Sequence, residues 1–166
     1  MPPADAEPDV LAASLADRLT ALTFADRTTD EVTQVLLDEI AAWAHDRGWR
    51  VYRRAASVAR LPPPYDRQHS YLDIACARPD GGPVVIEVDH TDRRRTVDKL
   101  LEEAAAGRTP IWVRWSSRAI ATPPDPVRLV AVPVTTVRGL HSRRHDLPVP
   151  THSAADLGDT EQPDLF

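Results

Sequence analysis

HSYLDIACARPDGGPVVIEVDHTDRRR, residues 69–95, is the stretch that decides the fold. Two apolar runs, 71–77 and 84–88, flank a turn of sequence Pro-Asp-Gly-Gly-Pro. A Pro- and Gly-rich turn between two runs of this kind is typical of a β-hairpin. The sequence therefore predicts two neighbouring antiparallel strands at the centre of the chain.

Three acids interrupt the apolar pattern of the hairpin: Asp73 in the first run, and Glu87 and Asp89 in or just after the second. Because side chains alternate along a strand, Glu87 and Asp89 share a face, and folding about the turn brings Asp73 opposite Glu87. Carboxylates this close repel one another unless a cation or a proton lies among them. Since Mg²⁺ and Mn²⁺ prefer oxygen ligands, the three carboxylates are candidate ligands of a metal site. The simpler alternative is that they are ordinary acidic residues at the ends of strands.

The other elements follow from apolar spacing on both sides of the hairpin. Helices are expected at 10–22, from Thr28 to Gly48 and from Thr91 or Asp92 to Ala106, and strands at 49–61, 111–115 and 127–134. The core order α-β-β-β-α-β predicts an α/β fold, a mixed central sheet flanked by helices. Residues 1–8 are expected to be disordered, 9–138 to form the domain and 139–166 to form a flexible tail.

Composition limits the classes of protein that the chain can represent. The formal charge of the 166 residues is −5, yet residues 47–118 hold fourteen basic and nine acidic side chains. This basic excess around the hairpin suits a polyanion, or is an ordinary solvated surface. Cys76 is the only cysteine, so no disulfide framework is expected, and neither a signal peptide nor a membrane span is evident. We expect a cytoplasmic protein; the sequence gives no indication of its oligomeric state.

Residues 29–115 resemble the core of the PD-(D/E)xK nuclease superfamily, a restriction-endonuclease-like fold. The resemblance implies that Asp73 and Glu87 bind Mg²⁺ or Mn²⁺, and that Glu39 from the preceding helix assists. Asp89 stands where that family usually has a lysine, and it could complete the catalytic site or hold a second cation. Lys99 is expected to point away from the apolar face of its helix and so to be a poor substitute.

Three arginines, Arg93, Arg94 and Arg95, open the helix that follows the acids. The planar guanidinium offers several donors to a phosphate, so these side chains are candidates for DNA contact. A solvated basic face is the equally simple alternative.

The chain ends in Gln162-Pro163-Asp164-Leu165-Phe166. This resembles the pentapeptide with which bacterial polymerases and repair factors bind the replication sliding clamp, the β subunit of the DNA polymerase. Gln162 would fix the register, Asp164 is the acidic position, and Leu165 and Phe166 would enter an apolar pocket. A chance apolar terminus is the alternative.

The sequence thus favours a metal-dependent deoxyribonuclease that is recruited to the sliding clamp for DNA repair or replication. A catalytically inactive adaptor with the same fold, which binds DNA or the clamp, is the alternative, and Asp89 in place of lysine is its main support. A small α/β domain of unrelated function is the third hypothesis.

Overall fold

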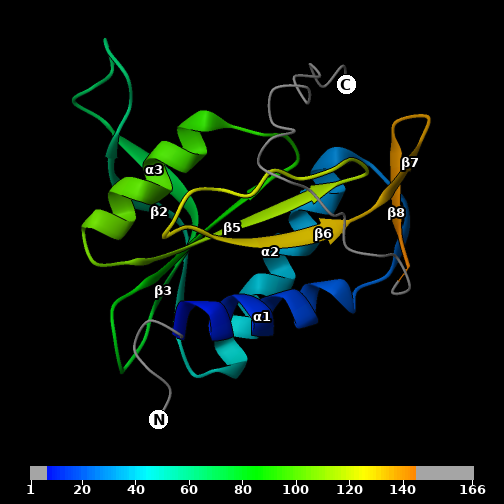
Figure 1. Cartoon of the computed structure of the whole chain (residues 1–166), viewed down its shortest axis with the longest axis horizontal. Helices are drawn as coiled ribbons and strands as arrows, with labels where there is room; N and C mark the ends of the chain where they lie inside the picture. Colours follow the sequence, from blue (N-terminus) through cyan, green and yellow to red (C-terminus); the bar gives the residue numbers. More distant parts are fainter. Residues whose placement is uncertain (1–6, 145–166) are drawn as a thin grey trace.

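A computed structural model describes residues 7–144 of the chain (Figure 1). Its helices are α1 (Glu7–Thr20), α2 (Thr29–Asp46) and α3 (Arg94–Ala105). Its strands are β1 (Phe24–Arg27), β2 (Arg50–Arg60), β3 (His69–Ala77), β4 (Val84–Asp89), β5 (Thr109–Ser116), β6 (Arg128–Pro133), β7 (Thr135–Val137) and β8 (Leu140–Arg143). None of the helices in this range is long and apolar enough to cross a membrane.

The main sheet is mixed, as predicted, with the strand order β2-β3-β4-β5-β6. The hairpin β3–β4 and the pair β2–β3 are antiparallel, whereas β4, β5 and β6 run parallel. The predicted crossover from β4 through α3 to β5 is confirmed. Parallel pairing requires such a connection, because the chain must return to the edge from which it started.

Helices cover both faces of this sheet, and the contacts of successive side chains along β4 show which helices cover which face. Ile86 packs in the larger core with residues of α1 and α2, such as Leu15 and Leu36. Its neighbour Val85 packs in a smaller core with Leu100 of α3. Since successive side chains of a strand face opposite ways, α1 and α2 lie on one face of the sheet and α3 on the other.

The second helix begins and ends where the sequence predicted. The Thr28 side chain accepts a hydrogen bond from the Glu31 N–H, and the Glu31 carboxylate accepts one from the Thr28 N–H. This capping box satisfies two backbone donors at the start of α2. Gly48 follows the helix with φ of +79°, a left-handed conformation that favours glycine.

A three-stranded sheet of order β1-β8-β7 was not predicted. Leu140–Arg143, which the sequence places in the flexible tail, form β8. Glu7 and Pro8, which it places in a disordered end, belong to α1. Arg143 is 2% exposed and donates to the Pro133 and Thr20 carbonyls. Such short strands carry no clear periodicity, and only their tertiary partners define them.

The turn of the hairpin is held against the loop that precedes β5. The Thr109 N–H donates to the Pro83 carbonyl at 2.9 Å, and a methyl group added at Gly82 would lie 2.5 Å from the Gly107 carbonyl oxygen. Two backbones therefore approach too closely here for any other residue.

We expect Gly82→Ala to lower the free energy of unfolding by about 1–3 kcal/mol, because the added carbon forces the two loops apart. Asp80→Ala, at an exposed position of the same turn, should change it by less than about 0.5 kcal/mol. Urea denaturation followed by circular dichroism measures both, and equal midpoints for the two variants would contradict the close approach.

Candidate active site at the divergence of β3 and β4

The two strands of the hairpin separate at the acidic residues. β3 and β4 are paired only at Cys76 with Val84, Ala75 with Val85 and Ile74 with Ile86. Beyond this point β4 stays with β5 as far as Asp89, and β3 stays with β2. The backbone groups of the two strands that face each other past Ile74 and Ile86 therefore need other partners.

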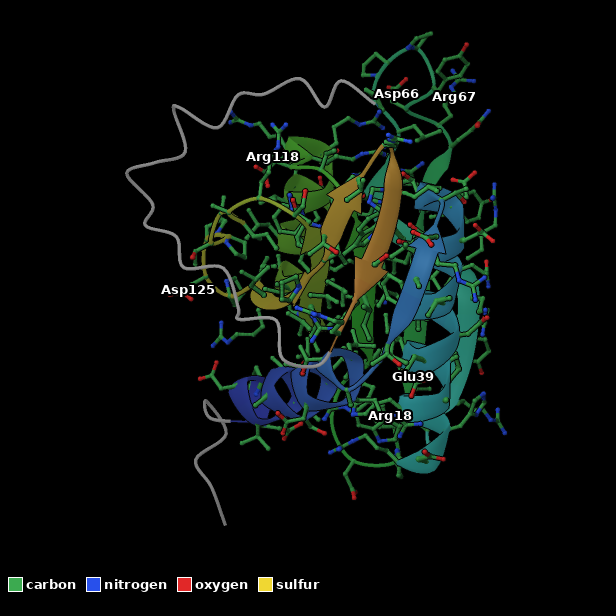
Figure 2. The ribbon with its side chains drawn as sticks, turned by 90° about the vertical axis from the view of Figure 1, so that its right-hand side faces the viewer. Arg18, Glu39, Asp66, Arg67, Arg118 and Asp125 are labelled. Atoms are coloured by element: carbon green, nitrogen blue, oxygen red, sulfur yellow. The ribbon has the colours of Figure 1, made fainter. Side chains whose placement is uncertain are left out.

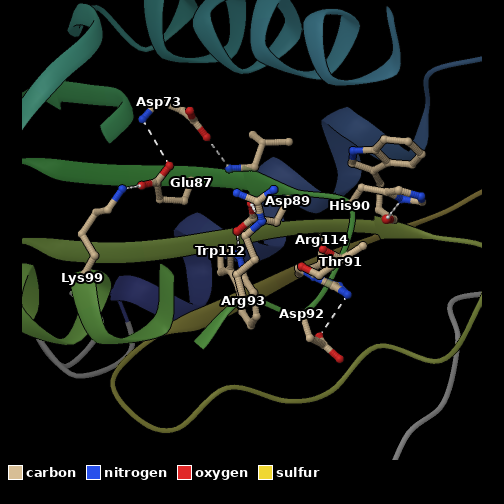
Figure 3. Close-up of polar contacts among 12 residues, drawn as sticks. Asp73, Glu87, Asp89, His90, Thr91, Asp92, Arg93, Lys99, Trp112 and Arg114 are labelled. Carbon is tan, nitrogen blue, oxygen red and sulfur yellow. Dashed lines mark hydrogen bonds and ion pairs between the residues drawn. The ribbon is translucent and has the colours of Figure 1, made fainter. Parts of the chain in front are cut away.

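Acidic side chains supply those partners (Figure 3). The Val88 N–H donates to Asp73 Oδ2 at 2.8 Å, and the Asp73 N–H donates to Glu87 Oε2 at 3.3 Å. Asp73 and Glu87 thus lie next to each other, as the register of the hairpin predicted. Glu87 is almost fully buried, with 4% of its surface exposed.

Lys99 reaches this pair from α3. Its ammonium group forms an ion pair with Glu87 Oε1 and donates to the Tyr71 carbonyl oxygen at 2.6 Å. The side chains are 16% exposed for Lys99 and 6% for Glu87, so water screens the contact little. Lys99, Asp73 and Glu87 are called the divergence site below.

The prediction that Lys99 points away from the sheet was wrong, because the apolar residues of α3 do not by themselves define the face that the helix buries. The buried residues of the helix are Thr96, Leu100 and Glu103. Two of these are polar, and Glu103 accepts hydrogen bonds from the Ser57 hydroxyl and the Val58 N–H of β2. Residue 99 adjoins this face, and periodicity cannot detect a helix face whose polar groups are satisfied by its neighbours.

Glu87 has a strongly shifted pKa. Burial, the largest influence, and the neighbouring Asp73 carboxylate raise the pKa of Glu87 to about 8, although the Lys99 ammonium acts in the opposite direction. Burial disfavours the charged carboxylate, and a second carboxylate nearby adds repulsion. The pair therefore favours whatever reduces its negative charge, a proton or a metal ion.

Asp89 lies apart from this pair. Its Oδ2 accepts a hydrogen bond from Trp112 Nε1 at 2.9 Å, and its Oδ1 lies 3.7 Å from Arg93 Nε. Within residues 7–144, no three Asp, Glu, His or Cys side chains are placed to hold one ion together. The structure thus brings together two of the three predicted carboxylates of the hairpin.

Glu39 lies on the other side of the sheet, in α2. Its Oε1 accepts a hydrogen bond from Arg18 Nε of α1 at 2.6 Å (Figure 2). An acid on the inner stripe of α2 is therefore explained by an ion pair between two helices. The structure does not bring Glu39 to Asp73 and Glu87.

Arg93, Arg94 and Arg95 are exposed at the beginning of α3. They line an open groove of about 640 Å³ together with Arg60 of β2 and Lys99. The first turn of α3 contains no acidic residue, and no side chain caps it. Because the N-terminus of a helix carries partial positive charge, arginines there add to a field that attracts anions.

The predicted cap of this helix was wrong. The N-cap residue is Arg93, and Asp92 instead pairs with Arg114 Nη2 of β5 at 3.0 Å. The Arg114 Nε also donates to the Thr91 carbonyl at 3.1 Å. The connection between β4 and α3 is thus anchored to β5. Because Asp92 is engaged there, no side chain caps the backbone N–H groups in the first turn of α3.

No family model, curated protein or solved structure matches the chain. The pentapeptide at residues 162–166 lies outside the residues that the structure describes.

The raised pKa of Glu87 predicts how stability depends on pH without metal. Below pH 4.5 Glu87 is protonated in both the folded and the unfolded protein. Between pH 4.5 and about 8 it is ionised in the unfolded protein but still protonated in the folded one. The contribution of Glu87 to stability is therefore fully present at low pH and is lost as pH rises towards 8. Glu87→Gln, which cannot ionise, should gain stability relative to the parent between pH 5 and pH 8.

Urea denaturation in EDTA at several pH values measures this difference in unfolding free energy. Glu102→Gln, at an exposed position of α3, is the control and should show no such trend. A constant difference between Glu87→Gln and the parent would mean that the pKa of Glu87 is not raised.

Proposed function

We propose that this protein is a metal-dependent nuclease of PD-(D/E)xK type that hydrolyses phosphodiester bonds in DNA. The observation that carries the proposal is the contact of Lys99 with Glu87 beside Asp73. Two carboxylates and a lysine are the groups that members of this family usually have. Lys99 supplies from α3 the cation that residue 89 lacks.

The carboxylate pair suits Mg²⁺ or Mn²⁺. Mg²⁺ is commonly held by one or two carboxylates together with water and substrate phosphates, so two protein ligands suffice. The raised pKa of Glu87 supports this assignment, because a bound cation relieves the repulsion that burial and Asp73 impose. Asp73 and Glu87 would hold the ion, which would supply Lewis acidity and a more acidic bound water.

The remaining groups have distinct roles in the proposed reaction. Water attacks phosphorus, one phosphorus–oxygen ester bond breaks, and the products are a phosphate monoester and a hydroxyl group. The Lys99 ammonium would stabilise the charge that develops on the phosphate oxygens. Arg93, Arg94 and Arg95 would bind neighbouring phosphates at the open start of α3.

An inactive adaptor with the same fold is the second candidate, and one observation favours it. Asp73, Glu87 and Lys99 already satisfy backbone groups of Val88, Asp73 and Tyr71 where β3 and β4 separate. Such a cluster could be retained to stabilise the divergence alone. An adaptor of this kind would bind DNA through the arginines and hydrolyse nothing.

Cleavage of labelled single-stranded, duplex and branched DNA with Mg²⁺ or Mn²⁺ tests the proposal. Asp73→Asn and Glu87→Gln should abolish cleavage, and Lys99→Met should lower its rate by about 10²–10³-fold, the cost of losing one preorganised charge-stabilising group. Asp89→Asn, outside the pair, should lower it by at most about 10–100-fold through Arg93. The control Asp80→Ala should retain the parental rate.

DNA binding without cleavage of any substrate would favour the adaptor. Cleavage that persists in each of the single variants Asp73→Asn and Glu87→Gln would refute the assignment of these two residues as the active site.

We further propose that residues 162–166 recruit the protein to the bacterial sliding clamp. The support is the sequence match alone: a glutamine, an acidic residue and a Leu-Phe pair at the required spacing. Leu165 and Phe166 would bury apolar surface in a pocket of the clamp.

Deletion of residues 162–166 should abolish binding to purified clamp, measured by surface plasmon resonance, and leave cleavage of free DNA unchanged. Leu165→Ala with Phe166→Ala should act like the deletion because the apolar contacts are lost, whereas Thr160→Ala should not. Unchanged clamp binding after the deletion would disprove recruitment through this peptide.

A further inference from the structure

The long edge strand β2 contains an arginine in an unusual backbone conformation. Arg54 has φ of +53°, in the left-handed region, although it lies in the interior of the strand. This conformation costs a non-glycine residue about 1–2 kcal/mol. Strained residues of this kind concentrate at functional sites, so Arg54 calls for an explanation.

Part of the explanation is geometric. Val51 packs in the core under α1 and α2, whereas the Ser57 hydroxyl binds Glu103 of α3 on the opposite face. On a regular strand Val51 and Ser57, six residues apart, would face the same side of the sheet. The alternation of side chains therefore reverses between these two residues, and Arg54 lies midway between them. A glycine would make this reversal at lower cost, and geometry alone does not account for an arginine.

The side chain of Arg54 accounts for the rest. Its guanidinium carbon lies 5.1 Å from the ring centroid of Tyr71, in β3. Tyr71 as a whole is 53% exposed, so about half of the residue stays accessible to solvent beside the guanidinium. The neighbouring Arg53 is instead paired with Asp38 of α2. The reversed backbone thus directs Arg54 to an exposed aromatic ring rather than to a carboxylate.

The backbone of this Arg54–Tyr71 pair adjoins the divergence site. The pairing of Arg53 with Ile74 and of Ala55 with Leu72 places Arg54 across from Asp73. The Tyr71 carbonyl accepts the hydrogen bond from Lys99, the residue that contacts Glu87. The exposed aromatic ring therefore lies on the strand of Asp73, β3, and the guanidinium lies on its neighbour β2.

We infer that Tyr71, with Arg54 over its ring, is a stacking site for an unpaired nucleobase, so that the divergence site takes single-stranded DNA. The inference rests on the proposed function for the nature of the substrate. Tyrosine rings stack on bases of any sequence, and the guanidinium adds a cation–π contact and a phosphate partner. A base in duplex DNA is already stacked on both faces, so only an unpaired base can use the ring.

Binding without metal tests this inference separately from cleavage. The probes are a fluorescently labelled oligothymidylate and a labelled blunt-ended duplex whose strands have the same length, followed by fluorescence anisotropy in EDTA at fixed salt. Tyr71→Ala should weaken binding of the single strand by roughly 5- to 150-fold, the range for one stacked base, and leave duplex binding unchanged. Tyr71→Phe keeps the ring and should bind like the parent.

Two further variants control for aromatic content and for folding. Tyr52→Ala removes a tyrosine that is 49% exposed on β2 and should leave both affinities unchanged. Arg54→Gly relieves the left-handed conformation, so it should not lower the melting temperature, and yet it should weaken single-strand binding.

Each other outcome overturns the inference. Single-strand binding that survives Tyr71→Ala, an equal loss for the duplex, or an equal effect of Tyr52→Ala would each mean that Tyr71 does not stack on a base. If the parent protein binds neither probe, the inference fails and the cleavage assay with metal decides the proposed function, whereas duplex binding alone overturns the inference and leaves the proposed function standing.

Discussion

The separation of β3 from β4 at Asp73 and Glu87 is the constraint on which the rest of the structure depends. Two antiparallel strands that part leave backbone donors and acceptors without partners in a region from which water is largely excluded. Here the two carboxylates and Lys99 take the places of the missing strand contacts. The same geometry concentrates charge, because each group that satisfies the backbone is ionisable.

The position of α3 follows from this separation. The helix packs on the face of the sheet that Glu87 shares with Val85, and Lys99 extends to Glu87 from beside the buried Leu100. Glu103, one turn further on, binds β2 and holds the helix on this face. The groove that the arginines line at the beginning of the helix also includes Lys99, so the residue that contacts Glu87 is shared by the groove and the carboxylate pair.

The bend of β2 and β3 is part of the same arrangement. Leu72 and Ile74 are two residues apart on β3, yet they pack on opposite faces of the sheet, with Asp73 between them. Arg54 lies across from Asp73 and carries the left-handed conformation. The alternation of side chains along β3 thus reverses at Asp73, where β3 leaves β4, and Tyr71 follows two residues away on the same strand.

The sequence by itself determined the hairpin, the capped helix α2, the parallel crossover and the juxtaposition of Asp73 with Glu87. These features depend on strong local signals: strand alternation, a capping box and a Gly-rich turn. The short strands β7 and β8 could not be predicted, because strands of three and four residues have no period to detect.

Only the tertiary structure decided which charged groups meet. Lys99 joins the carboxylates, Asp89 binds Trp112 and Glu39 pairs with Arg18. The physical reason is that a long polar side chain is placed by whatever partner lies within its reach across the fold. Periodicity assigns a residue to a face of its own element, but it contains no information on the charges that neighbouring elements present there.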